Sequence, residues 1–324
     1  MNDVSHALHK IARGTSIVFA GTIISMLFGF LTLAIIARTF SKAEYGVFSL
    51  ALTVINIALI IATLGFQNSL PREVAFYKEK DPARIDKLIS TALMVIALSS
   101  ILLMILLILE AENIARIFKD ERLIQALKII AFVLPFSALT SIIISITQGF
   151  GRVREKICFQ NVIHPTVFLL LVISGVLLTL DFNFVFLAYV IAQAFTLLAL
   201  MIDASKTRIL RFELSLDLAL GKKLIVFSIP LLFTGILGFV MTWADTLMLG
   251  YYKGSEVVGL YNSASPIAKL LPIFLSSASF LYVPLASGFY AQGKLGEMGR
   301  VYQILTKWVF LLTLPFFCST VPFS

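Results

Sequence analysis

The sequence predicts an all-α polytopic membrane protein with about nine transmembrane helices and a parallel six-helix internal repeat whose second lobe is incomplete. Composition is the first observation: hydrophobic residues make up 59% of the chain and charged residues only 14%, unlike a soluble domain. Run length is the second, since a helix needs roughly 20 apolar residues to cross a hydrocarbon core about 30 Å thick. Helices are the expected spanning form because the alternating pattern of a barrel is absent.

The third observation is the internal repeat. Residues 46–51 read glycine, apolar, aromatic, polar, any residue, alanine, and residues 259–264 read the same, 213 positions later. The same offset relates Pro71, Phe76 and Tyr77 to Pro284, Phe289 and Tyr290. Residues 17–19 recur at 225–227 with an offset of 208. Six predicted spans separate the two units, so both begin on the same side of the membrane and the repeat is parallel, an arrangement of two embedded halves.

The elements follow in chain order. Residues 1–14 place Val4, Ala7, Leu8 and Ile11 on one helical face and are predicted to form an interfacial helix. The predicted spans are about 15–37, 46–66, 88–109, 124–149, 157–180, 183–203, 224–250, 258–283 and 301–321. The basic segment 204–223 links the halves. We therefore expect a six-helix N-terminal lobe over 1–212 and an incomplete three-helix lobe over 213–324.

The distribution of lysine and arginine predicts the orientation. With the N-terminus in the cytoplasm, 17 of the 26 basic residues fall in cytoplasmic segments, mainly in 67–87, 151–156, 204–223 and 284–300. Cytoplasmic loops of membrane proteins carry this excess. The net charge of +8 thus reflects topology and anionic headgroups, and no nucleic-acid partner is needed to explain it. The predicted location is the cell (plasma or inner) membrane.

The sequence offers no signature of enzymatic chemistry. Cys158 and Cys318 lie in apolar runs without metal or redox spacing, and are read as small buried residues. There is no phosphate-binding glycine loop and no cluster of histidines. We expect a non-enzyme without cofactor or metal.

The strongest candidate for a binding residue is Lys269. It lies about 11 residues into its predicted span, hence about 16 Å deep, where an ionisable group is costly and a functional candidate. Its repeat counterpart is Asn56, also polar and near mid-span. Lys269 could pair with an anionic substrate, form a structural pair with Asp245, or extend to an interface. Asp245 could bind a coupling cation, accept a proton, or neutralise Lys269.

Further polar residues are weaker candidates for a cavity lining. Arg38 ends the first span, where an interfacial arginine is ordinary. His164 precedes a proline and could titrate near neutral pH, or pack as a buried hydrogen-bonding residue. Ser141, Ser145 and Gln148 share one helical face with Ser137, which suits sugar hydroxyls or close helix packing equally. Asn262 has a weaker case still.

Several short motifs resemble a known family. They are Phe227–Pro230, Trp243–Asp245, Ser255–Tyr261 and the opening Lys10–Gly14, which in this order look like the polysaccharide flippase branch of the multidrug/oligosaccharidyl-lipid/polysaccharide exporter superfamily. The resemblance covers nearly the whole chain. It implies two six-helix lobes around a central cavity that moves lipid-linked sugars outward by alternating access. Such proteins normally have twelve or more spans, so we expect this nine-span chain to be truncated.

The resemblance also implies the partners. They are an isoprenoid (pyro)phosphate-linked oligosaccharide and membrane lipids, with a glycan polymerase or ligase and a coupling ion, H⁺ or Na⁺, as further candidates. Two other functions stay open: a cation-coupled multidrug exporter of the same superfamily, and a non-transporting scaffold for glycan-synthesis enzymes. The deep cation at Lys269 favours an anionic substrate.

Overall fold

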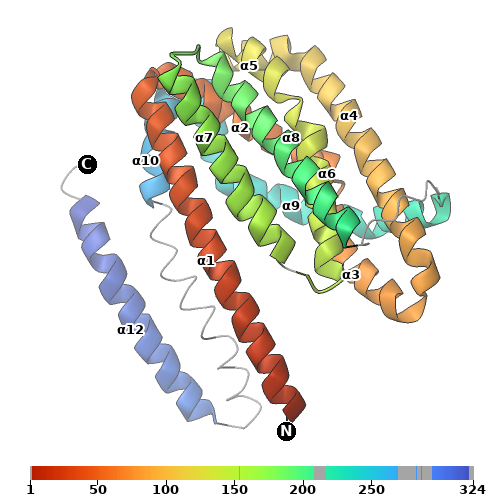
Figure 1. Ribbon diagram of the computed structural model, residues 1–324. Coiled ribbons are helices and arrows are strands. Elements are labelled where there is room, and N and C mark those ends of the chain that lie inside the picture. Colours follow the sequence, from red (N-terminus) through yellow and green to blue (C-terminus); the bar gives the residue numbers. More distant parts are fainter. Residues whose placement is uncertain are drawn as a thin grey trace. The chain divides into compact units, whose positions relative to one another are not determined.

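The computed structural model describes residues 2–152, 154–207, 217–268, 282, 286 and 294–320, and helix is the only regular structure among them (Figure 1). The all-α prediction is confirmed. The helices are α1 (Asn2–Thr39), α2 (Lys42–Ala62), α3 (Phe66–Lys80), α4 (Ile85–Phe118), α5 (Arg122–Ile130), α6 (Val133–Gly149), α7 (His164–Leu177), α8 (Asn183–Lys206), α9 (Leu218–Lys253), α10 (Ser255–Ala268) and α12 (Leu295–Thr320). A 3₁₀ turn covers Pro82–Arg84, and a π-helix covers Lys156–Ile163.

Six helices of the described residues are long and apolar enough to cross a membrane, or seven if α5 and α6, which meet at 41°, form one broken span. They correspond to the first seven predicted spans. The eighth, 258–283, begins in α10 and continues outside the described residues. The ninth coincides with α12, whose last side chains lie outside them as well. The count of nine is therefore not confirmed.

The N-terminal segment differs in form from the expectation. Residues 2–14 and the first span make one continuous helix, α1, of 38 residues. The predicted interfacial helix is thus not a separate element in the structure, because no proline stands between the two segments to break the helix.

The chain divides into two compact units, residues 1–261 and 262–324. In the first unit α6 packs on α3, α4 and α8, α7 packs on α8, and α1 packs on α7 and the π-helix. Helix α9 lies against α2, α3 and α4, so it belongs to this unit although it opens the second repeat. The predicted lobe boundary, 212/213, falls in 208–216, outside the described residues.

Two hydrophobic clusters hold the first unit together. One contains the buried side chains of Phe48, Leu127 and Phe186 and lies toward the end predicted to face outward. The other contains Phe66 and Leu88 and lies toward the predicted cytoplasmic end. Large apolar side chains on α1, α4 and α9 remain exposed, as expected of helices that face lipid.

Local sequence explains where the helices of interest begin. Ser41 caps α2 in a capping box, with Glu44 bonded back to the Ser41 backbone. Gly65 separates α2 from α3 with φ of +75°, a conformation that glycine adopts without strain. Pro165 lacks a backbone N–H, and the π-helix before it absorbs the change of register through the bond from His164 N–H to the Phe159 carbonyl.

Candidate functional site where the repeated halves cross

Helices α2 and α10 cross at two glycines that are equivalent in the repeat. A Cβ placed on Gly46 would lie 2.6 Å from the carbonyl carbon of Ser255, and one on Gly259 would lie 2.9 Å from the carbonyl carbon of Lys42. Ser255 is itself the repeat counterpart of Lys42, 213 positions later. Each glycine therefore leaves room for the backbone of the first residue of the opposite helix. Such a reciprocal contact is the mark of two-fold symmetry, and it supports the predicted parallel repeat.

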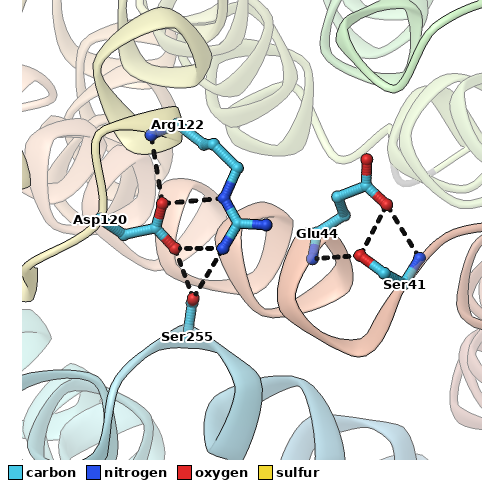
Figure 2. Close-up of polar contacts among 5 residues, drawn as sticks. All are labelled: Ser41, Glu44, Asp120, Arg122 and Ser255. Atoms are coloured by element: carbon cyan, nitrogen blue, oxygen red, sulfur yellow. Dashed lines mark hydrogen bonds and ion pairs between the residues drawn. The ribbon is translucent and has the colours of Figure 1, made fainter.

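An ionic cluster ties the start of α10 to the loop between α4 and α5 (Figure 2). Arg122 donates through Nε and Nη2 to the two oxygens of Asp120, at 2.9 and 2.8 Å. The Ser255 hydroxyl also donates to Asp120. Burial by itself raises the pKa of the Asp120 carboxyl, but the hydrogen bonds from Arg122 and Ser255 and the charge of Arg122 outweigh it, so the pKa lies below its usual value. We call these three residues the outer clasp.

Asp245 of α9 is held by α10 as well. The Tyr261 hydroxyl donates to one Asp245 oxygen, and the Thr246 N–H donates to the other at 2.7 Å. Tyr261 stands two residues after Gly259, so the same crossing sets its position. The contact between Tyr261 and Asp245 is not predictable from the sequence, because no periodicity relates residues on two different helices.

His164 lies in a separate pocket of the first unit, with about 220 Å³ of open space between α1, α2, α7 and α8. Its ring meets the Tyr189 ring edge-on, with centroids 5.3 Å apart. The Nε2 atom is buried without a hydrogen-bond partner among the described residues. Gln160 and Thr32 supply polar atoms to the same pocket. Irregular helix of the kind that precedes His164 is frequent at functional sites.

The serine face on α6 is used at least partly for packing. The Ser145 hydroxyl lies 3.1 Å from the Gln67 carbonyl of α3 and 2.8 Å from the Ser141 carbonyl. Ser145 is buried, whereas Ser141 and Gln148 are half-buried. A hydroxyl bonded to backbone in this way joins two helices.

The remaining predicted residues are spread over the fold. Arg38 is exposed at the end of α1, and Asn56 is half-buried on α2. Asn262 is buried in the second unit. Lys269 lies outside the described residues. The structure thus brings Asp245 and Tyr261 to the helix crossing and places His164 in a pocket of its own.

Taken together, a bundle of membrane-length helices and a reciprocal crossing of two repeated segments define a multi-pass helical membrane protein, and crossings of repeated segments are common among transporters. The chain belongs to the family described as "Polysaccharide biosynthesis protein", whose model matches residues 11–288. No curated protein matches the sequence.

Solved structures with the same fold are transporters. A point mutant of the MATE transporter VcmN of Vibrio cholerae is 13% identical with a TM-score of 0.64, over 95% of this chain and 72% of that one. An inward-facing multidrug resistance MATE transporter of the MOP superfamily is 14% identical with a TM-score of 0.69, over 92% and 71%. A MOP superfamily transporter of Pyrococcus furiosus, described as having a binding pocket of reverse polarity, is 15% identical with a TM-score of 0.61, over 94% and 70%.

Proposed function

We propose that this protein is a membrane transporter that flips isoprenoid (pyro)phosphate-linked oligosaccharide from the cytoplasmic to the outer leaflet by alternating access. The observation that carries the proposal is the match of residues 11–288 to the polysaccharide biosynthesis family. Surface glycans are assembled on lipid carriers whose charged headgroups do not cross a hydrocarbon core unaided. A two-lobed membrane protein of this family would carry the headgroup and its sugars across the hydrocarbon core.

The helix crossing gives the proposed transport cycle a movable barrier. Gly46 and Gly259 let α2 and α10 meet backbone to backbone, and the outer clasp fastens the same region. Opening toward the outside requires these contacts to part. The clasp consists of a few hydrogen bonds centred on one carboxylate, so a single local rearrangement releases all of them, as an alternating mechanism needs.

The cavity residues keep the roles proposed from the sequence. Lys269 pairs with the anionic headgroup, and Asn56 occupies the equivalent level of the first half. Asp245 and Arg38 line the transport route, and His164 binds substrate or solvent in its own pocket of the first unit. Ser141, Ser145, Gln148 and Asn262 offer hydrogen bonds to sugar hydroxyls. The Ser145 hydroxyl is the least available of these, because its bond to Gln67 already uses it.

A cation-coupled multidrug exporter is the second candidate, favoured by the likeness in fold to multidrug MATE transporters. Asp245 is exposed and could bind H⁺ or Na⁺ once released from Tyr261. The two functions differ in the charge of the substrate, since an exporter of cationic drugs needs an acid in its cavity and a flippase of diphosphates needs a base.

Reconstitution tests both functions. Vesicles containing the protein and a fluorescent isoprenoid diphosphate-linked oligosaccharide should expose it on the opposite leaflet, as read by quenching from outside. Lys269→Ala should abolish this movement, and Lys269→Arg should retain part of it because the charge remains. Lys253→Ala, which removes an exposed lysine at the end of α9, is the matched control. Normal flipping by Lys269→Ala, or gradient-driven efflux of a cationic dye without flipping, would refute the proposal.

A further inference from the structure

A groove with cationic and apolar walls runs beside α9 at the end of the first unit that is predicted to face the cytoplasm. It has about 740 Å³ of open space, and its lining includes Glu73 of α3 together with Lys222, Lys223, Phe227 and Pro230 of α9. Both helices come from segments rich in lysine and arginine. No residue considered above for the transport route lines it.

Close contacts between α3 and α9 fix the shape of the groove. The hydroxyls of Ser69 and Ser228 are 2.6 Å apart and buried. A Cβ on Gly65 would lie 2.6 Å from the Ser228 carbonyl oxygen, so only glycine allows the two backbones to approach this closely. The two helices are held together at this level, and the residues of α9 that line the groove lie on both sides of Ser228, from Lys222 to Leu231.

Two of the three cations at the groove, Arg72 and Lys223, are held in place by neighbouring side chains; Arg72 is not part of the lining but lies against Phe227, which is. The Arg72 guanidinium lies 4.8 Å from the centre of the Phe227 ring. The Lys223 ammonium lies 3.1 Å from the Tyr77 hydroxyl and 3.8 Å from Glu73. Lys222 is exposed and makes no hydrogen bond or ion pair within the described part of the chain. Three cations against one carboxylate leave an excess of two positive charges.

An apolar stripe leads away from the groove along α9. Val226, Pro230, Phe233, Leu237 and Met241 are all exposed, and their spacing of four, three, four and four places them on one helical face. The exposed fraction rises from 61% at Val226 to 90% at Met241. The stripe is about 22 Å long at 1.5 Å per residue, most of the thickness of a hydrocarbon core.

We propose that this groove is the loading site for an isoprenoid diphosphate, with the diphosphate between Arg72, Lys222 and Lys223 and the isoprenoid chain along the apolar stripe. The inference rests on the proposed function and names where the substrate first binds. A diphosphate esterified at both ends carries two negative charges and matches the excess of the groove, whereas an ordinary anionic phospholipid carries one. Simple exposure of α9 to lipid would explain the apolar stripe but not the cations beside it. A basic patch that faces water would explain the cations but not the stripe.

Direct binding to the purified full chain tests the site. We would measure dissociation constants in detergent for geranylgeranyl diphosphate, for dioleoylphosphatidylglycerol and for inorganic pyrophosphate. The isoprenoid diphosphate should bind most tightly, because it alone combines an apolar chain with two or more negative charges. The double variant Lys222→Gln/Lys223→Gln should weaken its binding about tenfold or more. The double variant Lys78→Gln/Lys80→Gln removes the same charge from α3 outside the groove and should change binding less than about twofold.

The single variant Lys222→Gln distinguishes a loss of binding from a loss of folding. Lys222 makes no intramolecular polar contact in the described part of the chain, so its variant should melt at the wild-type temperature and still bind about fivefold more weakly. Equal affinity for phosphatidylglycerol would show a general anionic-lipid site, and equal affinity for pyrophosphate would show that the apolar wall is not used. Either result, absence of binding to the wild type, or unchanged binding by the groove variants overturns the proposal.

The same proteins separate this inference from the proposed function. Flipping by the wild type with unchanged binding by the groove variants would refute the loading site and keep the flippase. Tight, groove-dependent binding without any flipping would refute the flippase and keep the site.

Discussion

Replacing Gly46 by alanine tests the helix crossing most directly. The new Cβ would overlap the Ser255 carbonyl oxygen, its nearest neighbour, and would lie 2.6 Å from the carbonyl carbon, whereas ordinary contacts begin at 3.4 Å. The two backbones must therefore separate by more than the 0.8 Å (3.4 − 2.6) that the carbon alone requires. The obstacle is backbone and has no rotamer to change. Overpacking of this kind costs about 1–3 kcal/mol. We expect thermal unfolding in detergent to begin several degrees lower for Gly46→Ala, and likewise for Gly259→Ala.

A helical glycine elsewhere provides the control. A Cβ on Gly238 of α9 would meet nothing within 4 Å, so Gly238→Ala should be neutral or slightly stabilising, since alanine favours helix by up to about 1 kcal/mol. The double variant Gly46→Ala/Gly259→Ala should cost much less than the sum of the two single variants, because separating the helices once relieves both contacts. A wild-type midpoint for Gly46→Ala, or fully additive losses, would refute the reciprocal contact.

Two further predictions concern the outer end of the molecule. The folded-state pKa of Asp120 lies below its usual value, so its stabilisation is complete above about pH 4 and is lost as the pH falls through that lower pKa. The difference in melting midpoint between wild type and Asp120→Asn should therefore be largest near neutral pH and vanish in strong acid; a difference that does not vary with pH would contradict this origin. With Cys158 and Cys318 replaced, Lys253→Cys should react with a membrane-impermeant maleimide on intact cells, and labelling only after permeabilisation would reverse the topology.

Composition and periodicity determined the class of fold, because burial in hydrocarbon leaves few alternatives for a chain of long apolar runs. The first seven predicted spans correspond to helices, and the Ser41 cap marks the start of α2. The boundaries were less predictable. Helix α1 continues back to Asn2, and the fourth span bends between α5 and α6, since helix ends depend on packing that no local pattern records.

The sequence alone determined that this is a helical membrane protein and predicted a parallel repeat at an offset of 213, since the lengths of apolar runs and the spacing of repeated residues are both properties of the chain itself. Only the tertiary structure decided that Gly46 and Gly259 face each other, that Asp245 bonds to Tyr261, and that the cations beside α9 form one groove. The physical reason is the same in each case. These contacts join residues on different helices, and their geometry depends on how closely two helix backbones approach. A glycine in the sequence permits a close approach but does not identify the helix that it will meet.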